Sequence, residues 1–253
     1  MKKEKLIAQL NPLFFQGICH RGLHNEQYTE NGLKAFENAM NHQMAIELDV
    51  HLTTDNGLIV CHDSELKRVT GKEGIIENMS VSQVQENYHL LDGEKIPTLK
   101  EVFDLVQERV PIVVELKVYK GNYRPLAKRL AEELKLIKDK RNIMLISFDP
   151  RALLPFKNSG FVRQLLVIND GKHNWIYSLR GLYEGLDMDY TFMKRKRYQR
   201  YGKKHLVNVW TIQSKEQVDM CLPYVDMMTF QNMDESYVHR ELTKKNFRIP
   251  GVK

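Results

Sequence analysis

Short runs of β-branched and apolar residues alternate with amphipathic runs along most of the chain. Apolar runs bounded by polar or turn-forming residues are typical of buried strands. They predict eight strands, at residues 14–19, 45–52, 112–118, 143–147, 163–168, 186–189, 206–211 and 225–229. Amphipathic segments such as 30–42, 124–138 and 215–221 predict helices between them. Strands that alternate with helices form parallel β-α-β units, and eight units close into a (β/α)8, or TIM, barrel.

A ninth β-rich run, at 58–62, follows the strand predicted at 45–52 after only five residues. These five residues end in Asn-Gly, which is a strong hairpin signal, and so short a connection cannot join parallel strands. The run is therefore predicted to be an antiparallel arm above the barrel mouth. A turn centred on Asn-Gly, or one residue earlier, would place His62 opposite Val50 or His51, next to Asp49.

Residues 63–97 lack the alternation of strands and helices found elsewhere. We interpret them as an insertion that caps the barrel mouth, with a helix at 79–88. The barrel resumes at Thr98-Leu99-Lys100-Glu101, where Thr98 and Glu101 have the spacing of a helix-capping box. The expected organisation is one barrel domain, residues 1–253, with this insertion inside it.

The composition fits this organisation, because 253 residues that are 42% hydrophobic and 28% charged suit one soluble domain with a large core. The net charge of +6 favours anionic substrates or serves solubility, and does not by itself indicate nucleic acid. Seven basic residues lie within 194–204. We interpret that segment as a solvated peripheral helix in preference to a nucleic-acid or membrane patch.

The three cysteines, Cys19, Cys61 and Cys221, include no CxxC pair. They indicate reduced thiols in a cytoplasmic protein, and neither a disulfide framework nor a zinc ribbon. Cys19 and Cys61 are expected in the core, because in extended backbone each should point away from the histidine that follows it. The basic start has too short an apolar run for a secretory signal, and no stretch approaches the roughly 20 apolar residues of a membrane span.

Polar residues follow several predicted strands at their carboxyl ends, where the functional residues of such barrels lie. The first strand is followed by His20-Arg21-Gly22. This tripeptide combines an imidazole, a guanidinium that can hold phosphate oxygens with two donors, and a glycine that permits close backbone approach. Taken alone, the tripeptide could also be an ordinary polar surface loop.

Three carboxylates are expected to face the barrel interior. Strand alternation places Glu47 and Asp49 on one face of the second strand, and Glu115 with Lys117 on one face of the third. Buried carboxylates cost several kcal/mol each, so either Arg and Lys side chains pair with them or a divalent cation binds them. Glu47, Asp49 and Glu115 would suit Mg²⁺, Ca²⁺ or Mn²⁺ better than Zn²⁺, because their ligand atoms are all oxygens.

Three further positions have two interpretations each. His51 is a polar residue at the barrel rim or an extra metal ligand. Glu30 and Asn31 cap the first helix, or they bring another carboxylate near the metal and His20. Trp210, at the end of a late strand, is a core residue or a substrate contact.

No GxGxxG, P-loop or GxSxG motif occurs in the chain. Binding of a nucleotide by a phosphate-binding loop and hydrolysis by a catalytic serine therefore have no support in the sequence. Catalysis by histidines and carboxylates remains.

The order of these motifs resembles that of glycerophosphodiester phosphodiesterases. The resemblance spans roughly residues 17–232 and rests on the whole series, since each motif alone is weak. The motifs are His20-Arg21-Gly22, Glu30-Asn31-Gly32, Glu47-Leu48-Asp49-Val50, Leu52-Thr53, Asp55-Asn56-Gly57, His62-Asp63, Pro97-Thr98-Leu99, Glu115-Leu116-Lys117 and Trp210-Thr211.

The resemblance implies a reaction and a set of site residues. Enzymes of this family cleave glycerophosphodiesters to glycerol 3-phosphate and an alcohol such as choline or ethanolamine. The implied residues are catalytic His20 and His62, metal ligands Glu47, Asp49 and Glu115, and phosphate-binding Arg21 and Lys117. We assign His20 as the acid and His62 as the base, which would act on a nucleophile such as the substrate's own glycerol 2-hydroxyl.

Two positions depart from the family pattern. Gly32 stands where the family usually has Thr, and the Thr-Phe-Gln-Asn sequence at 229–232 replaces a usual Thr-Asp. Both are expected near the leaving-group side, where they would affect substrate preference. The alternatives are a phospholipase D-like or phosphoinositide-cleaving barrel that acts on lipids, and a ligand-binding relic. The expected partner is a small-molecule glycerophosphodiester, without nucleic acid or stable membrane insertion.

Overall fold

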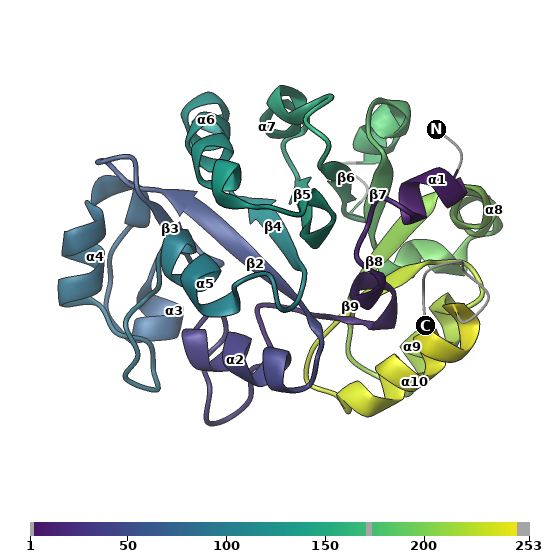
Figure 1. Cartoon of the computed structure of the whole chain (residues 1–253), viewed down its shortest axis with the longest axis horizontal. Helices are drawn as coiled ribbons and strands as arrows, with labels where there is room; N and C mark the ends of the chain where they lie inside the picture. The colour runs from purple at the N-terminus through teal and green to yellow at the C-terminus, as the bar shows by residue number, and fades with distance from the viewer. Residues whose placement is uncertain (1–2, 171–173, 247–253) are drawn as a thin grey trace.

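Eight parallel strands form a closed barrel in the computed structural model, which describes residues 3–170 and 174–246 (Figure 1). Each strand pairs with the next one, and β9 pairs with β1 to close the ring. The fold is therefore the predicted (β/α)8 barrel. Its strands are β1 (Ile18–Cys19), β2 (Ala45–Leu52), β4 (Ile112–Leu116), β5 (Ile143–Ser147), β6 (Val162–Val167), β7 (Gly185–Asp189), β8 (Leu206–Ile212) and β9 (Met227–Phe230).

Helices surround the barrel, and their apolar faces pack on its outer surface. The longer ones are α2 (Leu33–Asn41), α5 (Leu99–Val106), α6 (Tyr123–Glu133), α8 (Lys196–Lys204), α9 (Lys215–Cys221) and α10 (Glu235–Asn246), and α7 (Pro150–Leu153) is a single turn. Thr98 and Glu101 form the predicted capping box at the start of α5. Among the residues that the structure describes, no helix is long and apolar enough to cross a membrane.

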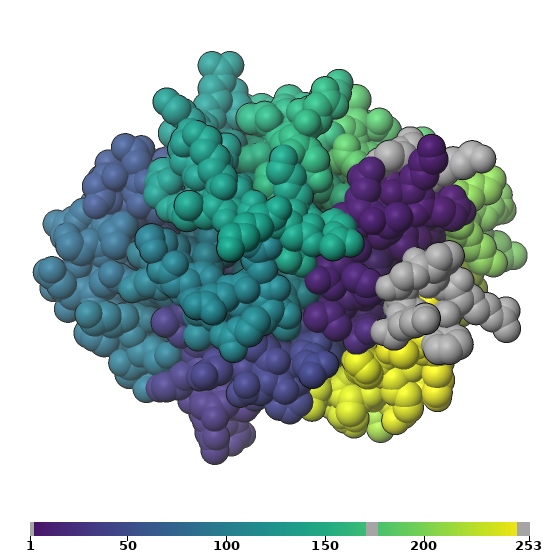
Figure 2. Space-filling model, in the orientation of Figure 1, coloured from purple at the N-terminus to yellow at the C-terminus, as the bar shows by residue number. Residues whose placement is uncertain are grey.

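The bottom of the barrel is filled by the N-terminal segment, which includes α1 (Lys3–Ile7) and the 3-10 helix η1 (Pro12–Gln16). Figure 2 shows this segment in purple. Phe14 and Phe15 are fully buried in the barrel interior. The prediction of a strand over 14–19 is therefore wrong for most of its length, because Pro12 and the Asn11 cap start a helical turn there.

The other predicted elements differ little from the observed ones. β2, β5 and α9 have the predicted bounds, and the remaining barrel strands agree within two residues at each end. The helices predicted at 30–42 and 124–138 are shorter, as α2 and α6 show.

The arm β3 (Leu58–Val60) runs antiparallel to β2, as predicted, but in another register. Val60 lies opposite Val50, so the pairing stops before His62. The prediction that His62 lies opposite Val50 or His51 is therefore wrong. The arm reaches further down toward the barrel than an Asn-Gly turn would allow.

The loop between β2 and β3 explains the difference in register. The backbone N–H of Thr53 donates to the Gly57 carbonyl at 3.0 Å, and the Gly57 N–H donates to the Thr53 hydroxyl oxygen at 2.8 Å. Asn56, with a φ of 61°, occupies the left-handed position. Gly57 is thus paired rather than at the tip, so the turn is centred on Asp55.

β1 and β3 occupy the same edge of β2. The other edge of β2 pairs with β4. β1 pairs with β2 only as far as Ile46, and β3 pairs with it from Val50 onward. The residues that follow these two strands, His20 and His62, therefore approach each other in the interval between the strand ends.

The insertion, residues 63–97, lies at one end of the long axis of the molecule (Figure 1). It contains α3 (Lys67–Thr70), the 3-10 helix η2 (Ile76–Asn78) and α4 (Val81–Asn87), and it packs its own apolar cluster with β3. A capping box between Ser80 and Gln83 starts α4, within the helix predicted at 79–88.

We predict that Gly22→Ala destabilises the fold more than Gly71→Ala. Both glycines have a left-handed φ, of 81° and 75° respectively, which costs a residue with a Cβ about 1–2 kcal/mol. A Cβ on Gly22 would also lie 2.9 Å from the backbone carbon of Ala35, whereas a Cβ on Gly71 would meet nothing within 4 Å.

Thermal unfolding measures the difference. At about 2–4 °C per kcal/mol, Gly71→Ala should lower Tm by a few degrees and Gly22→Ala by about twice as much or more. Equal decreases would show that Ala35 does not confine the loop that carries His20 and Arg21.

Candidate active site

Three carboxylates from two neighbouring strands converge at the barrel mouth. Glu47 and Asp49 belong to β2 and Glu115 to β4, and Asp49 lies directly opposite Glu115 in the parallel register. One oxygen from each of the three lies within 4.8 Å of the others. Their exposed fractions are 3%, 0% and 7%. The side chains that strand alternation places on one face thus form one buried cluster.

The positive groups around the cluster do not fully neutralise its negative charge. Burial, together with repulsion from Asp49, raises the pKa of Glu115 to about 7, and burial with repulsion from its two neighbours raises the pKa of Glu47 well above its ordinary value. Burial also opposes ionisation of Asp49, but Lys117, His62 and Arg21 hold the pKa of Asp49 below its ordinary value.

Two cations flank the cluster. The Lys117 ammonium lies 3.0 Å from Glu115 Oε1 and 3.3 Å from Asp49 Oδ1. The Arg21 backbone N–H donates to Glu47 Oε2 at 2.9 Å, and its guanidinium lies 3.6 Å from Asp49 Oδ2. Both side chains are about 15% exposed, so each borders the open part of the site.

The cluster is suited to a divalent cation. Its ligand atoms are all carboxylate oxygens, the donors that Mg²⁺, Ca²⁺ and Mn²⁺ prefer. Asp49 Oδ1 is buried without a hydrogen bond. A cation would also relieve the repulsion that acts on Glu47 and Glu115. Glu47, Asp49 and Glu115 are therefore the residues that could hold a metal.

Glu30 and Asn31 belong to this site and do not cap a helix. Gly32 is the N-cap residue of α2 and makes no side-chain cap bond. The Asn31 amide donates to Asp49 Oδ2 at 2.9 Å, and Glu30 accepts from the Arg21 guanidinium at 2.8 Å. Of the two interpretations of Glu30 and Asn31, the structure supports the one that places a carboxylate near the cluster.

The two histidines lie beside the cluster with one ring nitrogen of each held by an acceptor. His20 Nδ1 lies 2.5 Å from Gln231 Oε1, and His62 Nδ1 lies 2.6 Å from Asp63 Oδ1. In each ring this leaves Nε2 for the site. Burial, with the charge of Arg21, lowers the pKa of His20 to about 4, and burial also lowers the pKa of His62.

Several contacting residues were not recognised as part of the site from the sequence. Arg68 of the insertion donates to both Asp63 and Glu30, at distances of 2.6–2.9 Å, and so links the His62 side of the site to Arg21. Asp63 could have been found because it follows His62 in a family motif. Arg68 has no such signal, since its partner Glu30 is 38 residues away.

His51 has a role that neither of its two interpretations includes. It is 2% exposed, and its Nδ1 lies 2.6 Å from Glu77 Oε1 of the insertion. Its Nε2 lies 3.1 Å from the His62 carbonyl oxygen. Within the described part of the chain, the candidate metal cluster does not include His51. His51 joins the insertion to the backbone of His62.

The structure gives the contacts of the two departures from the family pattern. Gln231 bonds to His20. A Cβ on Gly32 would lie 2.9 Å from the backbone carbonyl oxygen of Thr29, and 2.8 and 3.1 Å from the side chains of Glu94 and Leu90 in the insertion. The Thr29 backbone and the packed insertion together leave little space for a larger residue at position 32.

Trp210 and Phe148 form an apolar wall, with ring centroids 5.6 Å apart and the rings edge to face. Both line the chamber of about 80 Å³ that contains His20, His62 and Glu115. Trp210 also packs on the barrel interior, and its indole N–H has no partner. Trp210 therefore has the contacts of a core residue and also lines the chamber, where its contact with substrate stays a prediction.

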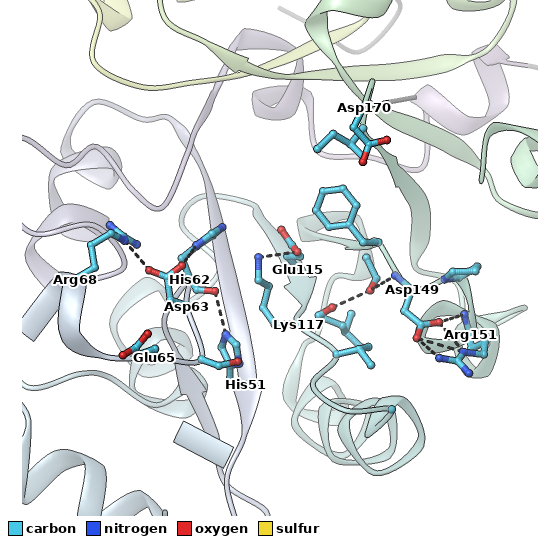
Figure 3. Close-up of a pocket in the computed structure, with 18 of the residues that line it drawn as sticks. His51, His62, Asp63, Glu65, Arg68, Glu115, Lys117, Asp149, Arg151 and Asp170 are labelled. Carbon is cyan, nitrogen blue, oxygen red and sulfur yellow. Dashed lines mark hydrogen bonds and ion pairs between the residues drawn. The ribbon is translucent and has the colours of Figure 1, made fainter. Parts of the chain in front are cut away.

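The chamber opens into a groove of about 1510 Å³, because His62, Glu115 and Phe148 line both. Figure 3 shows His62, Asp63 and Arg68 on one side of this groove and Asp149 with Arg151 on the other, with Glu115 and Lys117 between them. The insertion thus forms a wall beside the mouth.

Comparison with known proteins finds the same family by three routes. A family model described as the glycerophosphoryl diester phosphodiesterase family matches residues 20–233. A glycerophosphodiester phosphodiesterase of Caldanaerobacter subterraneus is 32% identical over 152 residues, which are 55% of this chain and 60% of that protein. A human protein named lysophospholipase D is 33% identical over 131 residues, 47% of this chain and 40% of that protein.

A crystal structure of a glycerophosphodiester phosphodiesterase from Thermotoga maritima has a TM-score of 0.70 with this chain at 27% identity. The alignment covers 88% of this chain and 95% of the Thermotoga chain. The aligned region spans about 60% of the length of the Caldanaerobacter protein. The family match includes every residue of the chamber described above. The chain therefore belongs to the glycerophosphoryl diester phosphodiesterase family, as the order of its motifs predicts.

Proposed function

We propose that the protein hydrolyses glycerophosphodiesters to glycerol 3-phosphate and an alcohol, with one divalent cation and two histidines. The observation that carries the proposal is the three-carboxylate cluster in one chamber with His20 and His62. A phosphodiester carries one negative charge, and more develops on its oxygens as the ester bond breaks. A cation at the cluster, with Arg21 and Lys117 beside it, suits that charge.

The cation would supply Lewis-acid stabilisation of a phosphoryl oxygen when bound to Glu47, Asp49 and Glu115. Mg²⁺, Ca²⁺ and Mn²⁺ all suit these ligands. Arg21 and Lys117 hold the other phosphoryl oxygens and neutralise their charge. The walls formed by Trp210 and Phe148 restrict water at the reacting bond.

His62 suits the role of general base. Its Nδ1 faces the Asp63 carboxylate, which stabilises the imidazolium formed when Nε2 accepts a proton from the nucleophile. His20 then protonates the leaving alkoxide through Nε2, while the Gln231 side chain keeps its ring oriented. Because burial lowers the pKa of His20 to about 4, its proton depends on the negative charge of the bound phosphate.

A second candidate function is cleavage of lysophospholipids, because the groove beside the chamber is large and the human relative is named lysophospholipase D. Leu116, Val118, Pro150 and Phe148 supply apolar surface to this groove. The insertion adds little to it, since its apolar residues pack inward and Leu91 is its one strongly exposed large apolar side chain. The small volume of the chamber favours deacylated substrates.

Removal of metal should abolish turnover. We predict that EDTA lowers release of glycerol 3-phosphate from glycerophosphocholine by more than about a hundredfold, because charge on the phosphoryl oxygens loses its main compensation. Added Mg²⁺, Ca²⁺ or Mn²⁺ should restore it. The assay uses each ion with glycerophosphocholine, glycerophosphoethanolamine and lysophosphatidylcholine.

The same assay separates the two candidate functions. Faster turnover of lysophosphatidylcholine than of both deacylated substrates would favour the lipid alternative. Full activity in EDTA, after exhaustive dialysis, would contradict a metal-dependent mechanism.

Loss of either histidine should affect rate far more than folding. We predict that His20→Ala and His62→Ala each lower kcat by about 10²–10⁴-fold, the usual contribution of a positioned acid or base. The matched control is His89→Ala, which removes an exposed histidine of the insertion. Near-full activity in either chamber variant, with unchanged circular dichroism, would rule out the two-histidine scheme.

A further inference from the structure

The positive charge of the chain is concentrated in one segment that the proposed reaction does not use. Residues 194–204 contain seven lysines and arginines and no acidic residue. Removing these seven from the chain's 38 lysines and arginines leaves 31, against 32 acidic residues. The whole surplus of positive charge therefore belongs to this segment, which includes α8.

The cations of α8 share one face. Tyr198 and Gly202 are buried, and a Cβ on Gly202 would lie 2.1 Å from the Tyr224 carbonyl oxygen, so this side is pressed against the protein. At 3.6 residues per turn, the five cations of the helix lie within an arc of about 120° on the opposite side. They are Lys196, Arg197, Arg200, Lys203 and Lys204, and all five are exposed.

Within residues 3–170 and 174–246, no ion pair joins any of the seven cations of this segment to an acidic side chain. Arg180 of the neighbouring 3-10 helix η6 (Asn174–Leu182) adds another cation above Tyr177, which packs on Tyr198. Burial and the charges of Lys3, Arg180 and Lys204 lower the pKa of His205, as a positive local potential requires.

Helix stability does not account for this arrangement. Arg195 is the N-cap residue of α8 and Lys196 and Arg197 lie in its first turn, which contains no acidic residue. Cations at a helix N-terminus oppose the helix dipole and destabilise the helix. Residues that act against local stability are expected where another function requires them.

We propose that this cationic face of α8, which the sequence alone predicts to be only a solvated surface, docks the protein on an anionic lipid bilayer. An exposed, convex helix face with five cations suits a flat surface of negative head groups, to which each nearby cation adds roughly fivefold in binding. A single-stranded nucleic acid would need free aromatic rings for its bases. Here Tyr177 and Tyr198 are buried, and Tyr201 stacks on His205 with ring centroids 4.2 Å apart.

The full-length protein tests this proposal in a vesicle sedimentation assay. The vesicles are phosphatidylcholine alone, or phosphatidylcholine with about one-third phosphatidylglycerol. At low salt the wild type should bind the anionic vesicles at least about tenfold more tightly, and high salt should remove the difference. Equal binding to both vesicles would overturn the proposal, whatever any variant does.

A pair of charge-matched variants locates the binding face. Lys196→Gln, Arg200→Gln, Lys203→Gln and Lys204→Gln together should weaken binding at least about tenfold. The control replaces four exposed lysines elsewhere by glutamine, at Lys34, Lys128, Lys138 and Lys157. It removes the same charge and should weaken binding less than about threefold.

Equal weakening by the two variants would overturn the proposal, as would tighter binding of the wild type to a labelled oligonucleotide than to anionic vesicles at the same salt. Unchanged melting temperature and unchanged turnover of glycerophosphocholine in the α8 variant would show that the loss comes from docking. Binding to vesicles needs no turnover, so this test stands apart from that of the proposed reaction.

Discussion

The structure depends on three carboxylates that must share one small buried volume. Asp49 and Glu115 face each other across two parallel strands, and Glu47 lies two residues before Asp49 on the same face. Such a cluster is costly unless cations surround it. Lys117, Arg21 and Asn31 supply part of the compensation through direct contacts, and the raised pKa of Glu115 and of Glu47 shows that they supply too little. A bound divalent cation would complete it, in the place where the proposed reaction requires a phosphoryl group.

The hairpin arm and the insertion bring the rest of the site to this cluster. β1 and β3 pair with successive parts of the same edge of β2. His20, which follows β1, and His62, which follows β3, therefore both line the chamber. The insertion holds that arrangement by two links, one that is buried and one through Arg68, which is exposed. Glu77 contacts His51, whose ring lies against the His62 carbonyl, and Arg68 joins Asp63 to Glu30, the partner of Arg21. Residues 63–97 therefore position His62 and Arg21 as well as forming one wall of the groove.

The sequence predicts the features that depend on local pattern and fails where distant contacts decide. Alternation along Ala45–Leu52 was enough to place Glu47 and Asp49 on one face, and the capping box at Thr98 marked the start of α5. The hairpin register could not be predicted, because the Thr53 side chain bonds to Gly57 and moves the turn away from Asn-Gly. Phe14 and Phe15 are of a residue type that is common in strands. At the bottom of the barrel, however, they are buried as part of a 3-10 helix. Arg68 reaches the site only through the fold, because its partner Glu30 is 38 residues away.

Isothermal titration calorimetry of a divalent cation into the EDTA-treated protein tests the central claim most directly. Saturable binding of about one Mn²⁺ or Mg²⁺ per chain is expected. Asp49→Asn should abolish it, because Asp49 is the carboxylate of the cluster whose ionised form its neighbours stabilise. Glu65→Gln, which changes an exposed carboxylate of the groove, should leave it unchanged. Absence of binding to the wild type, or equal binding to Asp49→Asn, would contradict the assignment of Glu47, Asp49 and Glu115 as the metal site.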